Sequence, residues 1–199
     1  NWVGSEQKQT DQLSFNPVIF ENAGERVSRM VTEKVHYEDS VVRNFSVQHS
    51  LDFFDEYHYK YREVARYFSL FKYINNNFKY VNDAQRDEYF ATPRETILNG
   101  MGGDCDDHSI LMAGCLMSIG AKCRLVITEG HMYPEIYAGD KRKFEIAQQA
   151  IIQLFGEEGV DRIYYHESDG EYWMNLDYTA GHPGGEYMND NVKLLVNIP

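Results

Sequence analysis

The stretch from residue 92 to residue 128 limits the possible folds of this chain more than any other. Thr92 and Glu95 have the spacing of a capping box, which predicts that a short helix begins there. A glycine-rich turn follows, and apolar residues at helical spacing then predict a second helix over residues 106–119. Apolar and β-branched residues over 122–128 predict a buried strand. Two helices and a core strand are therefore expected to meet around the turn.

Cys105 is placed at the N-terminus of the second predicted helix, directly after the turn over residues 102–104. Backbone N–H groups and the positive end of the helix dipole favour a thiolate at such a position. The same N–H groups can hold an oxyanion that forms on a substrate carbonyl. Cys105 is therefore a candidate nucleophile. Cys115 and Cys123 lie inside the helix and strand patterns and are expected to be buried thiols, while a disulfide between them stays open.

A cysteine nucleophile needs a base, and the base needs a group that orients it. His131 opens the strand predicted after Gly130, and Asp177 ends the strand predicted over residues 171–177. If these strands are neighbours in one antiparallel sheet, both side chains meet at its edge beside Cys105, as a triad requires. Because some order of these residue types occurs in almost any chain with seven histidines, the prediction depends on the helix start and the strand ends.

Three segments around these residues resemble motifs of the transglutaminase-like superfamily. They are residues 103–108 (GDCDDH), 131–137 (HMYPEIY) and 173–179 (WMNLDYT). The family usually has His-Ala-Trp-x-Glu-x-Tyr at the second segment and Trp-x-x-Leu-Asp-Pro-Thr at the third. The resemblance extends from about Tyr61 to Gly181. It implies an α+β fold with the papain-like core of microbial transglutaminase-like cysteine peptidases, in which the nucleophile helix packs on an antiparallel sheet.

The sequence departs from the family pattern between the histidine and the aspartate. A helix is predicted over residues 141–155, where the family usually has a short hairpin. If this insertion rebuilds the sheet edge, Asp177 is displaced and another acceptor orients His131. Tyr133 and Pro134 also alter the strand beside the site, and Pro134 is expected to weaken it.

Electrostatics opposes a thiolate at the predicted nucleophile. Asp104, Asp106 and Asp107 surround Cys105 with negative charge, and nearby carboxylates raise the pKa of a thiol. A thiolate then survives only if it pairs with a protonated imidazole. An ion pair between Cys105 and His131 is therefore our hypothesis for the resting site.

Two further roles in the site are open. Tyr80 is a candidate for the second oxyanion donor, since a phenol hydroxyl can supply one, although an aromatic residue is more often part of a core. Cys105, His108 and His131 form a possible zinc ligand set. Structural zinc sites usually have paired ligands at both ends, and this sequence has no second pair. We therefore expect no metal and no cofactor.

Patterns elsewhere in the chain predict its remaining elements. Helices are expected over 21–35 and 61–77, a short extended piece within 36–55, a loop over 83–89, and strands over 162–165 and 192–198. Residues 1–60 are expected to form an N-terminal helical extension packed on a catalytic core over residues 61–199, within one compact domain overall.

Composition limits the partners of the chain. The formal net charge of −12 opposes binding to nucleic acid and to an anionic membrane surface. No stretch is long and apolar enough to span a bilayer, and no signal peptide is recognisable. The chain begins at Asn1 rather than Met, so the compartment stays open, including the case of a lost upstream signal or anchor. The oligomeric state is unknown at this level.

The predicted activity is acyl transfer on the amide of a peptide or protein substrate. Cys105 attacks the carbonyl, His131 protonates the leaving amine and Asp177 orients His131. Release of the acyl group to water makes the protein a cysteine peptidase or amidase. Transfer to an amine, as in transglutaminases, is one alternative, and a noncatalytic binding or scaffold domain with the same core is another.

Overall fold

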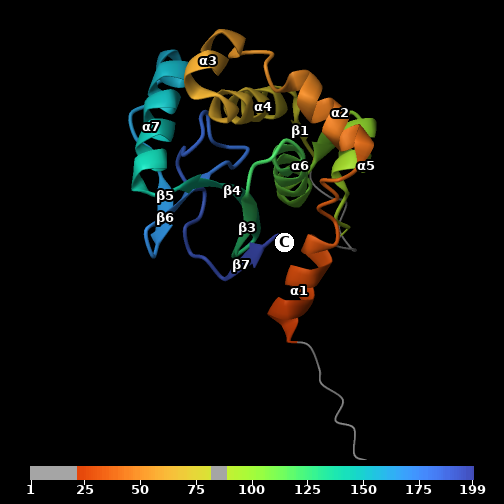
Figure 1. Ribbon diagram of the computed structural model, residues 1–199. Helices are drawn as coiled ribbons and strands as arrows, with labels where there is room; N and C mark the ends of the chain where they lie inside the picture. Colours follow the sequence, from red (N-terminus) through yellow and green to blue (C-terminus); the bar gives the residue numbers. More distant parts are fainter. Residues whose placement is uncertain (1–21, 82–88) are drawn as a thin grey trace, which may run out of the picture.

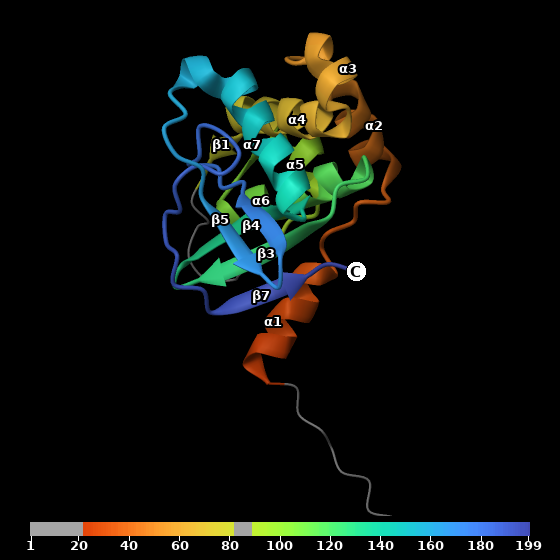
Figure 2. The ribbon, with the colours of Figure 1, turned by 60° about the vertical axis from the view of Figure 1, so that its left-hand side comes forward.

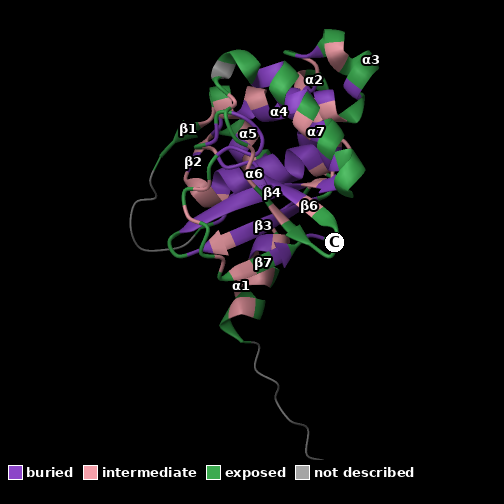
Figure 3. Cartoon of the chain, turned by 90° about the vertical axis from the view of Figure 1, so that its left-hand side faces the viewer, coloured by how far each residue is buried: buried purple, intermediate pink, exposed green. Residues whose placement is uncertain are grey.

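Helix α6 (Cys105–Ser118) lies at the centre of the molecule, beside the main sheet and among the other helices (Figure 1). The computed structural model describes residues 22–81 and 89–199. Buried residues lie on every side of α6, which is almost wholly purple in Figure 3. A helix buried all round is a core helix, and it cannot move without repacking its neighbours. The predicted helix over residues 106–119 is confirmed, with both ends one residue earlier.

Within the described residues, the main sheet has five antiparallel strands in the order β5-β6-β4-β3-β7 (Figure 2). The strands are β3 (Cys123–Thr128), β4 (His131–Gly139), β5 (Tyr165–Ser168), β6 (Glu171–Asn175) and β7 (Leu194–Asn197). Glu135 of β4 lies opposite Asn175 of β6. The predicted adjacency of the histidine strand and the strand before Asp177 is therefore present. A small parallel pair joins β1 (Lys79–Tyr80) to β2 (Gly102–Gly103), just before α6.

The helices surround α6 and one part of the sheet (Figure 1). Besides α6, the helical segments are α1 (Ala23–Thr32), α2 (Ser40–His49), η1 (Asp55–Tyr57), α3 (His58–Tyr61), α4 (Glu63–Asn77), α5 (Pro93–Leu98), α7 (Lys141–Phe155) and η2 (Gly156–Glu158). The capping box predicted for α5 is present, since Glu95 N–H donates to Thr92 Oγ1 at 3.3 Å and Thr92 N–H donates to Glu95 Oε2 at 2.7 Å. The order of helices and antiparallel strands confirms the predicted α+β class.

The short extended piece predicted within residues 36–55 is wrong, because α2 occupies much of this segment. Asp39 caps the helix: its Oδ1 accepts from the N–H of Val41 at 2.7 Å and of Val42 at 3.4 Å. Val42 and Ser46 are fully buried, and α2 packs against α6. The cap and the tertiary burial outweigh the strand preference of the valines in this segment.

Strand β4 continues through Pro134, although the sequence predicts a weaker strand there. The Pro134 carbonyl accepts from the N–H of Leu176 at 2.9 Å. Because paired antiparallel residues exchange two hydrogen bonds, proline removes only the return bond to Leu176. This pair lies at the end of the ladder between β4 and β6, where a missing donor does little to weaken the sheet.

Most of the other predicted elements are present with shorter ends. The helices expected over 21–35 and 61–77 are α1 and α4, and the last expected strand is β7. The strand expected over 162–165 begins only at Tyr165, because the preceding residues pair with the loop at Gly184 rather than with a strand. The loop expected over 83–89 lies almost wholly outside the described residues.

The helices of the N-terminal region pack on the same core as the rest of the chain. α1 contacts β7, and α2 contacts α4, α5 and α6. One hydrophobic cluster extends from Val31 to Ile198. The division into an extension over residues 1–60 and a core over 61–199 stays a prediction. Among the described residues, no helix has the length and apolar character needed to cross a bilayer.

Gly114 provides a test of the packing between α6 and the start of α5. A Cβ added at Gly114 would lie 2.6 Å from Pro93 Cγ. We expect Gly114→Ala to lower the free energy of unfolding by about 1–3 kcal/mol, because overpacking outweighs the better helix propensity of alanine. Gly156→Ala is the matched control, since nothing lies within 4 Å of a Cβ added there. Urea unfolding measures both, and equal stability of the two variants would contradict the packing argument.

Candidate active site

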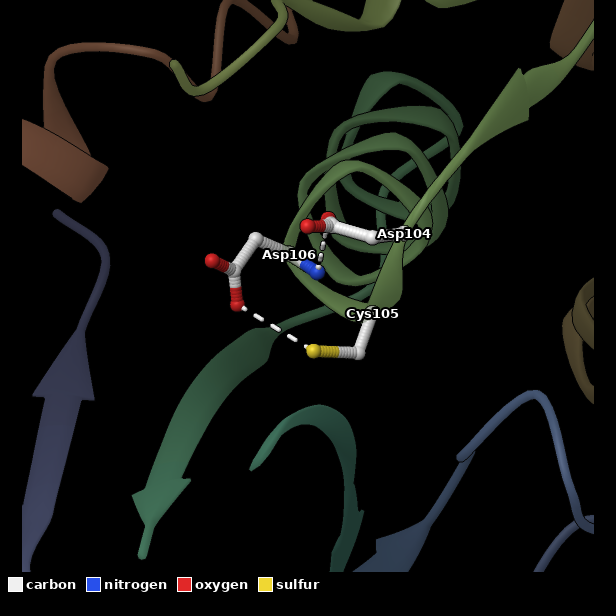
Figure 4. A group of neighbouring side chains, drawn as sticks. All are labelled: Asp104, Cys105 and Asp106. Carbon is white, nitrogen blue, oxygen red and sulfur yellow. Dashed lines mark hydrogen bonds between the residues drawn. The ribbon is translucent and has the colours of Figure 1, made fainter. Parts of the chain in front are cut away.

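Asp104 caps α6 and holds the turn that carries Cys105 (Figure 4). Its Oδ1 accepts from the N–H of Asp106 at 3.0 Å and of Asp107 at 3.4 Å. Two of the N–H groups that the sequence analysis offers to a thiolate or an oxyanion are therefore already occupied by the aspartate. The Cys105 N–H has no acceptor among the described residues, and its role as an oxyanion donor stays a prediction.

The surroundings of the Cys105 sulfur favour its neutral thiol form. Its pKa is raised to about 12, mainly by burial and then by the Asp106 carboxylate, while the N–H of Met132 lowers it and Asp104 raises it further. The S–H group donates to Asp106 Oδ1 across 3.5 Å (Figure 4). These surroundings oppose the thiolate that the helix dipole favours. The ion pair with His131 stays a prediction.

His131 and Asp177 are hydrogen-bonded in the described structure. His131 Nε2 lies 2.5 Å from Asp177 Oδ2, and both side chains are buried. The bond leaves Nδ1 as the imidazole nitrogen that can exchange a proton elsewhere. Asp177 is itself held, because its N–H donates to Asn175 Oδ1 at 2.9 Å and its Oδ1 accepts from Thr179 N–H at 3.3 Å. The orientation of His131 therefore depends on a well-supported carboxylate.

The first turn of helix α6 contacts the start of strand β4 next to Cys105. The backbone N–H of Met132, the residue that follows His131, lies near enough to the Cys105 sulfur to lower its pKa. Ser109 Oγ lies 2.6 Å from the Cys105 carbonyl oxygen and 3.0 Å from the Met132 carbonyl oxygen, so its hydroxyl can donate to either. These contacts join the helix to the start of the strand. Cys105, His131 and Asp177, predicted from the sequence, are thus brought to one end of the sheet.

Two tyrosines form an aromatic wall beside the three residues. The ring centroid of Tyr178 lies 6.1 Å from that of His131, and Tyr80 stacks on Tyr178 at 4.9 Å. Burial and, to a smaller extent, the nearby Cys105 and Tyr178 raise the pKa of Tyr80 to about 12. Tyr80 therefore lies near the sulfur, as its suggested role requires. That role as an oxyanion donor stays a prediction.

The possible zinc ligands from the sequence do not come together as a group. His108 is fully buried, and its Nε2 lies 2.9 Å from Asn75 Oδ1, so this nitrogen is already used. Among the described residues, the group whose ligand atoms lie within 4.8 Å of one another is Asp104, Cys105 and Asp106. Such acidic groups are common without an ion.

The inserted helix does not displace the aspartate from the histidine. α7 packs against β4, β6 and α4. β4 carries His131, and β6 leads to Asp177. Phe144 of α7 stacks on Tyr172 of β6, with ring centroids 4.6 Å apart. Asp177 follows that strand and keeps its bond to His131. The second departure, Tyr133, is fully buried, so it changes the interior beside the site.

Several supporting residues were not predicted from the sequence. They are Asn75, Ser109, Met132, Asn175 and Tyr178. Asn175 and Tyr178 lie within the third motif, so the sequence alone could have predicted that they lie close to Asp177. Asn75 is 102 residues from Asp177, and no pattern in the sequence indicates this contact.

Comparison with known proteins identifies a family. Residues 54–178 match the model of the transglutaminase-like superfamily. Among curated proteins, no sequence match is found. A solved structure of Legionella pneumophila LapG is 14% identical with a TM-score of 0.43, over 83% of this chain and 78% of LapG. The EGTA-treated form is 15% identical with a TM-score of 0.41 over the same shares. The calcium-bound form is 14% identical with a TM-score of 0.35, over 87% of this chain and 75% of LapG.

Removal of the Asp106 carboxylate should make Cys105 more reactive. Asp106→Asn takes away a negative charge that raises the thiol pKa. We expect the iodoacetamide labelling rate of Cys105 at pH 8 to rise by about 3- to 10-fold, because the thiolate fraction grows tenfold for each unit of pKa lowered. Mass spectrometry of the labelled peptide gives this rate. Glu157→Gln is the control, and equal rates in the two variants would contradict the electrostatic argument.

Burial of His108 should make stability depend on pH. Burial lowers its pKa to about 4, so the folded protein excludes a proton that the unfolded chain binds near its ordinary pKa of 6.5. The stabilisation is complete above pH 6.5 and is lost as the pH falls toward 4, at up to about 1.4 kcal/mol per pH unit. Urea unfolding between pH 7 and pH 5 should therefore show a smaller loss of stability in His108→Gln than in the natural sequence. Parallel pH dependences would rule this out.

Proposed function

The chain belongs to the transglutaminase-like superfamily, and on this premise we propose that it is a cysteine peptidase or amidase. The proposed catalytic residues are Cys105, His131 and Asp177. The observation that carries the proposal is the hydrogen bond from His131 to Asp177 beside a cysteine at a helix start. A histidine held by a carboxylate in this way has one nitrogen free to serve a nucleophile.

In the proposed first half-reaction, His131 Nδ1 takes the thiol proton as Cys105 Sγ attacks the amide carbonyl. The carbonyl oxygen becomes an oxyanion, which the Cys105 N–H is placed to stabilise. His131 then gives the proton to the leaving nitrogen as the carbon–nitrogen bond breaks. The products are a free amine and a thioester on Cys105.

In the second half-reaction, His131 removes a proton from water as the water oxygen attacks the thioester. The carbon–sulfur bond breaks, and the sulfur recovers the proton from His131. Asp177 keeps the same bond to the imidazole through both steps, which stabilises the imidazolium that forms in each. The raised pKa of Cys105 supports a mechanism in which proton transfer accompanies attack, rather than one that starts from a stored thiolate.

We infer that the substrate is a peptide or protein segment. Tyr80 is 45% exposed and stacks on Tyr178 next to the thiol, which supports contact with an extended, partly apolar chain. Transfer of the same acyl group to an amine would use the same thioester. The acceptor therefore has to be decided by product analysis.

The raised thiol pKa favours one alternative from a different class. A noncatalytic binding domain would have no need of a reactive thiolate, and the surroundings of Cys105 raise the pKa of its thiol to about 12. Such a domain would label at Cys105 no faster than at its fully buried cysteines, Cys115 and Cys123.

The test is cleavage of a complex peptide library, with products identified by mass spectrometry. Cys105→Ala should abolish cleavage, and Asp177→Asn should reduce it by about 10²- to 10⁴-fold, because the imidazole loses its charged partner. His36→Ala, at an exposed histidine, should cleave as the natural sequence does. Addition of a primary amine shows whether it replaces water in the products.

The proposal is wrong if two results occur together. The natural sequence would produce neither hydrolysis nor amine transfer across the library. In addition, iodoacetamide at neutral pH would label Cys105 no faster than Cys115 and Cys123. The noncatalytic binding domain would then be the better description of the chain.

A further inference from the structure

His108 connects the nucleophile helix to a residue of another helix. It lies three residues after Cys105 on α6 and is fully buried. Its Nε2 lies 2.9 Å from Asn75 Oδ1, on α4. The ring is held in place by aromatic neighbours, with its centroid 4.9 Å from that of Phe78 and 5.8 Å from that of Tyr178. This contact fixes Asn75 relative to the helix that carries the thiol.

Asn75 in turn reaches the turn that carries the acid. Its Nδ2 donates to the Ala180 carbonyl at 3.2 Å and, more weakly, to the Asp177 carbonyl at 3.5 Å. The turn is closed by a bond from Ala180 N–H to the same Asp177 carbonyl at 3.0 Å. The side chain of Asn75 therefore spans the space between α6 and residues 177–180.

The polarity of this bridge follows from its two ends. Backbone carbonyls only accept hydrogen bonds, so the amide nitrogen of Asn75 must face the turn and its oxygen must face His108. His108 Nε2 then carries the hydrogen, and Nδ1 has a lone pair with no partner among the described residues. A neutral histidine supplies the needed donor without placing a second charge near Asp177 and His131.

We propose that Asn75 and His108 are positioning residues, which hold the His131–Asp177 pair in register with the Cys105 helix. The inference rests on the proposed function for its importance to turnover. The bridge is a hydrogen-bonded side-chain connection from α6 through α4 to the turn that follows Asp177. Loss of the bridge frees the turn from one side, while Asn175 still holds the Asp177 N–H from the other.

The first test removes the donor to the turn. Asn75→Ala should increase the exchange rate of the His131 Nε2 proton with water by about 3- to 10-fold, because one hydrogen-bond contribution to the turn is lost. NMR follows the signal of this proton, which lies in the hydrogen bond between His131 Nε2 and Asp177 Oδ2. Asn77→Ala is the matched control, since among the described residues the Asn77 side chain donates to the Tyr73 carbonyl of the same helix, at 2.8 Å. The control should exchange as the natural sequence does.

The second test separates the bridge from simple packing at His108. His108→Gln keeps a donor for Asn75, whereas His108→Leu keeps apolar volume without a donor. A bridging role predicts slower exchange of the His131 proton in His108→Gln than in His108→Leu, even if His108→Leu is the more stable variant. A packing role predicts the reverse order. Urea unfolding of each variant corrects the rates for the unfolded fraction.

The outcomes distinguish this inference from the proposed function. The positioning proposal is overturned if Asn75→Ala and Asn77→Ala have equal exchange rates of the His131 proton. It is also overturned if exchange is slower in His108→Leu than in His108→Gln. Both conclusions hold whatever the protein cleaves. If the exchange rates change as expected but the natural sequence has no hydrolase or transferase activity, the bridge is supported and the peptidase proposal fails. Neither readout requires a substrate.

Discussion

The burial of α6 on every side is the constraint on which the rest of the structure depends. A helix in this position must fit the sheet, α2, α4 and α5 at once, and Gly114 is small because Pro93 lies against it. Cys105 begins this helix, so the position of its sulfur is set by the core and not by a surface loop. The candidate site is therefore built on one of the most rigid parts of the molecule. That rigidity suits a reaction in which small displacements of the nucleophile are costly.

The start of α6 serves two opposing needs. Asp104 stabilises the helix by accepting from the N–H groups of Asp106 and Asp107, and the acidic residues suit the positive end of the dipole. The same carboxylates raise the pKa of the thiol that a catalytic mechanism has to deprotonate. The contribution of Met132 N–H acts in the opposite direction. In the mechanism that we propose, His131, held by Asp177, relieves this conflict by accepting the proton during attack.

Sequence reasoning predicted the parts of the structure that depend on local patterns. The capping box at Thr92, the bounds of α7 and the pairing of the strands near His131 and Asp177 all follow from motifs or periodicity. It failed at α2, where burial and the Asp39 cap outweigh valine preference. It also missed the bridge from His108 through Asn75, because a contact between distant segments leaves no mark in the spacing of either one. Electrostatic effects of burial are equally invisible in a single sequence.

The raised pKa of Cys105 has a consequence for the oxidation chemistry of its sulfur. Peroxides oxidise thiolates far more readily than thiols, so a sulfur kept in its S–H form is a slow target for sulfenic acid formation. A nucleophile stored in this way is expected to tolerate an oxidant that would inactivate a preformed thiolate. By raising the thiol pKa, the acidic residues next to Cys105 would slow the oxidation of its sulfur. The same effect would slow the reaction of Cys105 with electrophiles.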